Sequence, residues 1–114
     1  MDLGLKGKVA LVTGGSAGIG LGIADKLARE GCKLVICGRN QQNIKQTESW
    51  LIQQIPDLEI LSLSADVQKY NQSEKLVNEA LEKFGKIDIL INNSQGASFS
   101  SDAVEKISDD EVNW

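Results

Sequence analysis

Histidine is absent from the 114-residue sequence, and proline occurs once. Without histidine, imidazole is excluded as a catalytic base, and a Ser-His-Asp triad or a zinc site becomes implausible. No apolar run approaches the ~20 residues that a membrane-spanning helix needs, and the first residues lack the long apolar stretch of a signal peptide. These absences predict a cytoplasmic protein that uses neither a metal nor a membrane.

Cysteine and positive charge are both scarce. Cys32 and Cys37 lie on one predicted strand, roughly 16 Å apart at ~3.3 Å per residue, which is too far for a disulfide. The 12 Lys and Arg residues against 16 Asp and Glu residues give a formal net charge of −4, which argues against a nucleic-acid partner. With 41% hydrophobic and 25% charged residues, residues 1–114 have the composition of a single soluble domain.

The sequence does contain a short apolar segment, Val9 to Thr13, that runs into a glycine-rich turn and then a predicted helix. Gly14, Gly18 and Gly20 let the backbone reverse tightly and let a ligand approach it closely. The N-terminus of the helix adds unpaired N–H groups and the positive end of its dipole. These features predict an anion site suited to a pyrophosphate. The alternative interpretation is an ordinary turn between a strand and a helix.

Strand and helix patterns alternate along the chain. Apolar segments predict strands at 8–13, 33–37 and 87–91, and a segment rich in Ile and Leu, with less clean alternation, predicts a strand at 58–63. Helical spacing predicts helices at 18–30, 42–54 and from Asn71 or Ser73 to Gly85. A polar loop over 94–102 and the beginning of another helix over 103–114 follow. With right-handed crossovers, this alternation predicts an α/β fold: a Rossmann-like, doubly wound parallel sheet of about four strands in the order 3-2-1-4.

Polar or turn residues follow each predicted strand. Because ligands of such sheets bind beyond the carboxyl ends of the strands, at the point where the strand order reverses, we expect these segments to form one site. They are the glycine turn, Gly38-Arg39, Asp66-Val67 and Asn92-Asn93.

With these segments the chain closely resembles the N-terminal half of the short-chain dehydrogenase/reductase family over essentially its whole length. The resemblance is carried by Thr13-Gly14-x-x-x-Gly18-Ile19-Gly20, Asp66-Val67 and Asn92-Asn93. It implies that the backbone from Ser16 to Ile19 holds the pyrophosphate, that Asp66 contacts adenine, and that Asn93 holds a ribose. The predicted cofactor-binding residues are Gly14, Ser16, Ala17, Gly18, Ile19, Gly20, Arg39, Asn40, Asp66, Val67, Asn93 and Ser94. A nucleoside-cofactor methyltransferase also opens with a glycine-rich turn after a strand, but the Gly18-Ile19-Gly20 spacing and the Asn92-Asn93 pair disfavour that fold.

The end of the second strand bears on the choice of cofactor. A carboxylate there hydrogen-bonds the ribose 2′-hydroxyl of NAD, whereas an arginine accommodates the 2′-phosphate of NADP. Here Gly38 occupies the expected acidic position, and Arg39 follows it with a guanidinium suited to a phosphate. We therefore predict NADP(H) in preference to NAD. In the alternative interpretation Arg39 is a solvated turn residue.

The sequence departs from the family pattern after Asn93. Where the family has Asn-Asn-Ala-Gly, this chain has Asn92-Asn93-Ser94-Gln95-Gly96. Either Gly96 replaces the usual glycine through a shifted loop, or the reactive end of the cofactor is placed differently.

The resemblance also implies that the catalytic serine, tyrosine and lysine belong to a segment beyond Trp114. The one tyrosine, Tyr70, is followed by Lys75 rather than by a lysine at position 74, so no catalytic residue is assigned.

We expect the chain to be the NADP(H)-binding portion of an oxidoreductase acting on a carbonyl or alcohol, truncated and inactive by itself. We also expect it to form homo-oligomers through its fourth strand or residues 103–114. The alternatives are a nucleotide-binding module without catalysis and a self-associating scaffold.

Overall fold

The computed structural model describes residues 4–15 and 18–93. Its elements alternate between strand and helix: β1 Val9–Thr13, α1 Gly18–Arg29, β2 Lys33–Gly38, α2 Gln41–Gln54, β3 Ile60–Ser64, α3 Tyr70–Phe84 and β4 Ile89–Asn92. The predicted polar loop and last helix, over 94–114, lie outside the described residues.

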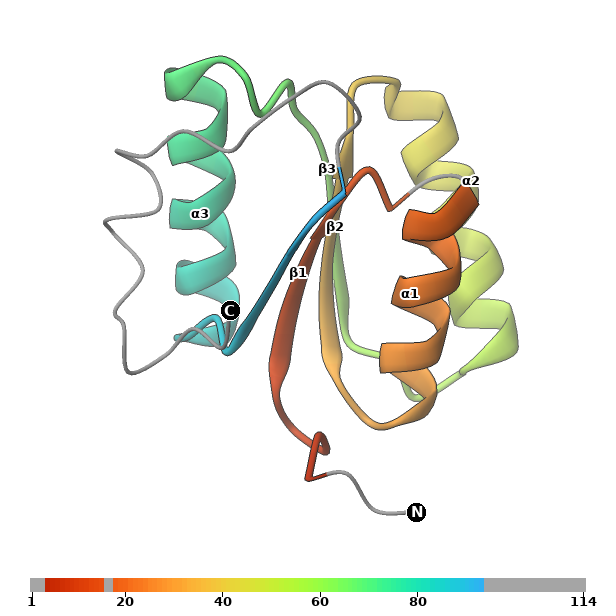
Figure 1. The fold of residues 1–114 in the computed structure, drawn as a ribbon. Helices are drawn as coiled ribbons and strands as arrows, with labels where there is room; N and C mark the ends of the chain where they lie inside the picture. Colours follow the sequence, from red (N-terminus) through yellow and green to blue (C-terminus); the bar gives the residue numbers. More distant parts are fainter. Residues whose placement is uncertain (1–3, 16–17, 94–114) are drawn as a thin grey trace.

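The strands form one parallel sheet in the order β3-β2-β1-β4, as predicted. Helices cover both faces: α3 lies on one side, and α1 and α2 lie together on the other (Figure 1). Since every strand is parallel, all four carboxyl ends point to one edge of the sheet. In register, Thr13 of β1 lies between Cys37 of β2 and Asn92 of β4.

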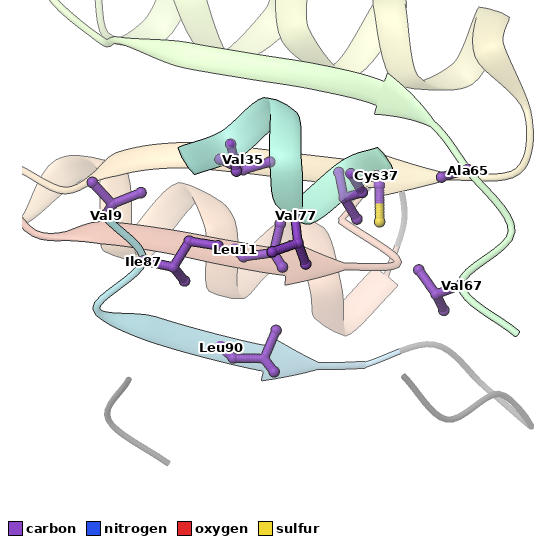
Figure 2. Close-up of a cluster of buried hydrophobic side chains, with 11 residues drawn as sticks. Val9, Leu11, Val35, Cys37, Ala65, Val67, Val77, Ile87 and Leu90 are labelled. Carbon is purple, nitrogen blue, oxygen red and sulfur yellow. The ribbon is translucent and has the colours of Figure 1, made fainter. Parts of the chain in front are cut away.

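Two hydrophobic cores lie on opposite faces of the sheet because side chains alternate along each strand. Val9 and Leu11 of β1 face α3, and Ala10 and Val12 face α1 and α2. Figure 2 shows the core on the α3 side, where Val77 of the helix meets the strand residues. This core consists of Val9, Leu11, Val35, Cys37, Ala65, Val67, Leu76, Val77, Ala80, Ile87 and Leu90.

The start of α3 and the packing of Ile19 differ from prediction. Neither Asn71 nor Ser73 caps α3, because the helix begins earlier, with Lys69 at the cap position and no side-chain hydrogen bond there. Ser73 is instead fully buried and donates a hydrogen bond to the Tyr70 carbonyl. In the sequence Ile19 stands at helical spacing with Ile23 and Leu27, which predicts a place on the apolar face of α1. It is instead 76% exposed, because Gly20 occupies the buried position in this first turn.

Both cysteines are free and buried, in agreement with the predicted absence of a disulfide. No helix in the described part of the chain is long and apolar enough to span a membrane.

Candidate functional site

The glycine turn between β1 and α1 brings two segments of backbone into close contact. Gly14 and Gly18 have φ values of 66° and 57°, a left-handed conformation that glycine adopts without strain. The Gly14 N–H donates to the Cys37 carbonyl of β2 at 2.9 Å. A Cβ on Gly20 would collide with the Gly14 carbonyl and lie 2.8 Å from Asn93 Nδ2. The bare Cα of Gly20 therefore allows α1, the turn and the end of β4 to meet.

Thr13, the last residue of β1, fixes the end of β4. Its Oγ1 accepts a hydrogen bond from the Asn93 N–H at 2.8 Å. The Thr13 hydroxyl in turn donates towards two acceptors, Asn92 Oδ1 at 3.2 Å and the Ile91 carbonyl at 3.3 Å. Since Thr13 is fully buried, these bonds replace solvent for a buried polar group. They hold the Asn93 backbone beside the glycine turn.

The turn after β2 is tied to the end of β3. The Gly38 carbonyl accepts from the Ala65 N–H at 2.9 Å, and the Arg39 carbonyl accepts from Ser64 Oγ at 3.1 Å. Asn40 caps α2, accepting from the Asn43 N–H through Oδ1 at 3.0 Å. The Arg39 side chain is exposed. Its backbone carbonyl is held by Ser64, and the next residue, Asn40, caps the N-terminus of α2. This capping role of Asn40 was not part of its sequence-based assignment.

The segment after β3 is fixed by bonds to α3 and within its own turn. The Asp66 N–H donates to Gln72 Oε1 at 2.7 Å. Asp66 Oδ1 accepts from the Gln68 N–H at 3.1 Å, and the Asp66 carbonyl accepts from the Lys69 N–H at 3.0 Å. The Val67 side chain is buried in the core, so Val67 offers a ligand only its backbone.

Cys37 lies at the carboxyl edge of β2, close to the glycine turn, and Figure 2 shows Ala65 and Val67 at the same end of the sheet. Burial raises the pKa of the Cys37 thiol from 9.0 to about 12, although a backbone hydrogen bond with Gly14 acts in the opposite direction. The thiol is therefore protonated at neutral pH and serves as a small apolar side chain.

The structure brings the described members of the predicted site to one edge of the sheet. Ser16, Ala17 and Ser94 lie outside the described residues. Sequence analysis missed Ser64, Gln72 and the hydrogen-bonding role of Thr13, whose bonds hold the predicted residues in place. In the described ranges, no group of three or more Cys, Asp or Glu side chains could hold a metal ion.

The geometry defines a doubly wound parallel sheet with a glycine turn and polar segments at its carboxyl edge. The sequence model of the short chain dehydrogenase family matches residues 8–113. The chain belongs to this family of oxidoreductases.

Relatives and solved structures show the same similarity. The chain is 42% identical over 98 residues to a 12alpha-hydroxysteroid dehydrogenase of Clostridium sp., covering 81% of this chain and 38% of the relative. L-sorbose reductase from Gluconobacter frateurii, solved with NADPH and L-sorbose, superimposes with a TM-score of 0.80 at 32% identity, covering 96% of this chain and 41% of the reductase. A short chain dehydrogenase/reductase from Burkholderia phymatum, solved with NAD, has a TM-score of 0.71 at 34% identity. The match covers 75% of this chain and 30% of that protein. This chain thus spans between 30% and 41% of the length of these relatives.

Proposed function

We propose that this chain is the NADP(H)-binding portion of a short-chain dehydrogenase/reductase that transfers hydride to or from a carbonyl or alcohol. The observation that carries the proposal is the close approach of Gly20 to both the Gly14 carbonyl and Asn93 Nδ2. This approach lets α1 begin directly against the glycine turn, which is the arrangement in which a helix N-terminus binds a pyrophosphate. When bound, the nicotinamide supplies the hydride chemistry, and the protein supplies binding and orientation.

Each segment at the carboxyl edge has an assigned part of the dinucleotide. The turn from Gly14 to Gly20, with Ser16 and Ala17, holds the pyrophosphate, and Asn93 with Ser94 holds a ribose. Asp66 accepts a hydrogen bond from the adenine amino group, with the Val67 backbone beside it. NAD and NADPH in the solved relatives support a nicotinamide dinucleotide as the ligand class.

Arg39 makes NADP(H) the preferred cofactor in this proposal. Its guanidinium is exposed, and its backbone carbonyl is held by Ser64, next to the N-terminus of α2, which favours anions. A 2′-phosphate placed here would meet a planar guanidinium suited to bidentate binding.

Calorimetric titration with NADP⁺, NAD⁺ and ADP-ribose tests the proposal. The wild-type chain is expected to bind NADP⁺ more tightly than NAD⁺, and Arg39→Ala to weaken NADP⁺ binding by about tenfold while leaving NAD⁺ binding unchanged. Arg29→Ala is the matched control, because Arg29 is a half-exposed arginine paired with Asp25 on α1. Equal wild-type affinities for NADP⁺ and NAD⁺ would contradict the cofactor assignment. Binding of none of the three ligands would favour the scaffold alternative.

We also propose that these 114 residues bind the dinucleotide without turning it over. Tyr70, the one tyrosine of the sequence, lacks a lysine four residues later and stands at the start of α3. An assay of NADPH oxidation with a simple carbonyl compound should therefore show no reaction above the background rate. Turnover by the purified chain would contradict this proposal.

A further inference from the structure

Gln72 lies in the first turn of α3, yet its side chain bonds outside the helix. In a capping box, a Glu or Gln at the third helical position returns to the N–H of the cap residue, which here is Lys69. Gln72 Oε1 instead accepts from the N–H of Asp66, three residues before that cap, at 2.7 Å. The backbone N–H of Gln72 still donates to the Lys69 carbonyl at 3.0 Å. Gln72 therefore connects the start of α3 directly to the segment that follows β3.

Asp66 is held by this bond and by two others. Its carbonyl accepts from the Lys69 N–H, and its Oδ1 accepts from the Gln68 N–H. Both of these bonds belong to the local turn 66–69. Gln72 supplies the bond that comes from a regular element. None of the three bonds uses Oδ2, which is thus the oxygen best suited to meet a ligand.

We propose that Gln72 is the positioning residue for adenine recognition: it orients Asp66 so that Oδ2 accepts a hydrogen bond from the 6-amino group of the purine. This inference rests on the proposed function, which assigns Asp66 to the adenine. The turn 66–69 alone holds the Asp66 carbonyl and Oδ1 but leaves the Asp66 N–H without this partner, so that only Gln72 ties the Asp66 backbone to a side chain of α3. If the Asp66 carboxylate is already oriented before the cofactor binds, no binding energy is lost in ordering it, and the affinity is higher.

The test compares NADP⁺ with its hypoxanthine analogue, in which an oxo group replaces the 6-amino group. A carboxylate oxygen that accepts from the amino group faces a second acceptor in the analogue, so the wild-type chain should bind NADP⁺ more tightly. Gln72→Ala is expected to weaken NADP⁺ binding about fivefold and to leave the analogue unchanged, so that the ratio of the two affinities falls about fivefold. General damage to the fold would weaken both ligands equally and leave the ratio intact.

Two variants complete the experiment. Gln72→Glu keeps an oxygen acceptor on a side chain of the same length and should retain the wild-type ratio. Gln53→Ala makes the same truncation at an exposed position of α2 and should change neither affinity. A wild-type ratio near one would refute the assignment of Asp66 to adenine, and with it the proposed function at this point. A clear wild-type ratio that Gln72→Ala leaves unchanged would refute the positioning role alone.

Discussion

Among the described glycines, Gly20 is the position at which an added side chain would fit least well. An added methyl group would collide with the Gly14 carbonyl, and the turn cannot easily retreat, because the Gly14 N–H is bonded to β2. Gly22, in the same helix, has open space around the position of a Cβ. The two glycines therefore separate the effect of close packing from that of helix propensity.

Gly20→Ala should lower the free energy of unfolding by about 1–3 kcal/mol, as overpacked sites do, and weaken dinucleotide binding. Gly22→Ala should raise that free energy by up to about 1 kcal/mol, because alanine favours a helix more than glycine does. Urea unfolding followed by circular dichroism measures both. If the two variants changed stability in the same direction, the contact between α1 and the turn would not have the importance assigned to it.

Cys37 gives the protein a pH dependence on the alkaline side. Its pKa of about 12 in the folded chain lies above the ordinary value of 9.0, so the folded state binds the thiol proton more tightly than the unfolded state does. The stability from this difference is fully present below pH 9 and is lost as the pH rises from about 9 to 12. Over that range a single group contributes a slope of up to about 1.4 kcal/mol per pH unit.

Unfolding free energies of the wild-type chain and of Cys37→Ala, measured between pH 7 and about 11, test this effect. The wild-type curve should fall more steeply above pH 9, and the variant should lack that part of the fall whatever its stability at pH 7. Cys32→Ala provides a comparison at the second buried cysteine. Parallel curves for wild type and Cys37→Ala would show that Cys37 does not titrate differently in the two states.

At the level of the elements, Asp88 connects the start of β4 to the start of β1. Asp88 Oδ2 accepts from the Val9 N–H at 2.8 Å and lies 3.2 Å from Lys86 Nζ, and the Asp88 N–H donates to the Val9 carbonyl at 2.9 Å. Val9 is fully buried. The carboxylate therefore satisfies a backbone donor that water does not reach.

Asp88→Ala should lower the free energy of unfolding by about 1–3 kcal/mol, the cost of leaving a buried donor without a partner. Asp25→Ala removes an i,i+4 ion pair with Arg29 on the surface of α1 and should cost no more than about 0.5 kcal/mol. Chemical unfolding of the two variants beside the wild type measures the difference. A loss in Asp25→Ala as large as that in Asp88→Ala would contradict the role of the buried donor.

The order of the elements could be predicted from the sequence because apolar runs and helical spacing are local signals. The alternation of strand and helix, with the right-handed crossover rule, then leads to the observed strand order. The start of α3 was predicted wrongly, because Asn71 and Ser73 are strong cap residues in sequence, whereas the helix begins at Tyr70 without such a cap. Ser73 is fully buried inside the helix and its hydroxyl bonds to the Tyr70 carbonyl, so it does not serve as a cap.

The candidate site was predictable only in part, for a related reason. Strand ends can be found from the sequence, so Arg39 and Asp66 could be singled out. The bonds that hold them come from Ser64, 25 residues away from Arg39, and from Gln72, whose role depends on where α3 begins. Such partners become visible only when the register of β3 and the start of α3 are known.

At the scale of the whole molecule, β4 is an edge strand of the sheet that the structure describes. Leu90 is buried on the α3 side, and Ile91 is half-buried on the side of α1. Exposed strand edges with apolar side chains recruit further strands. We therefore propose that the 114-residue chain self-associates through β4.

Sedimentation velocity over a range of micromolar concentrations tests this proposal, and the expected result is a sedimentation coefficient that rises with concentration. Ile91→Lys places a charge on the edge strand and should shift the chain towards the monomer, because charged residues discourage pairing at sheet edges. Ile52→Lys, at an isoleucine 40% exposed on α2, is the matched control and should associate as the wild type does. Circular dichroism of each variant establishes that it is folded. A wild-type monomer at every concentration would refute association through β4, and equal effects of the two variants would place the contact elsewhere.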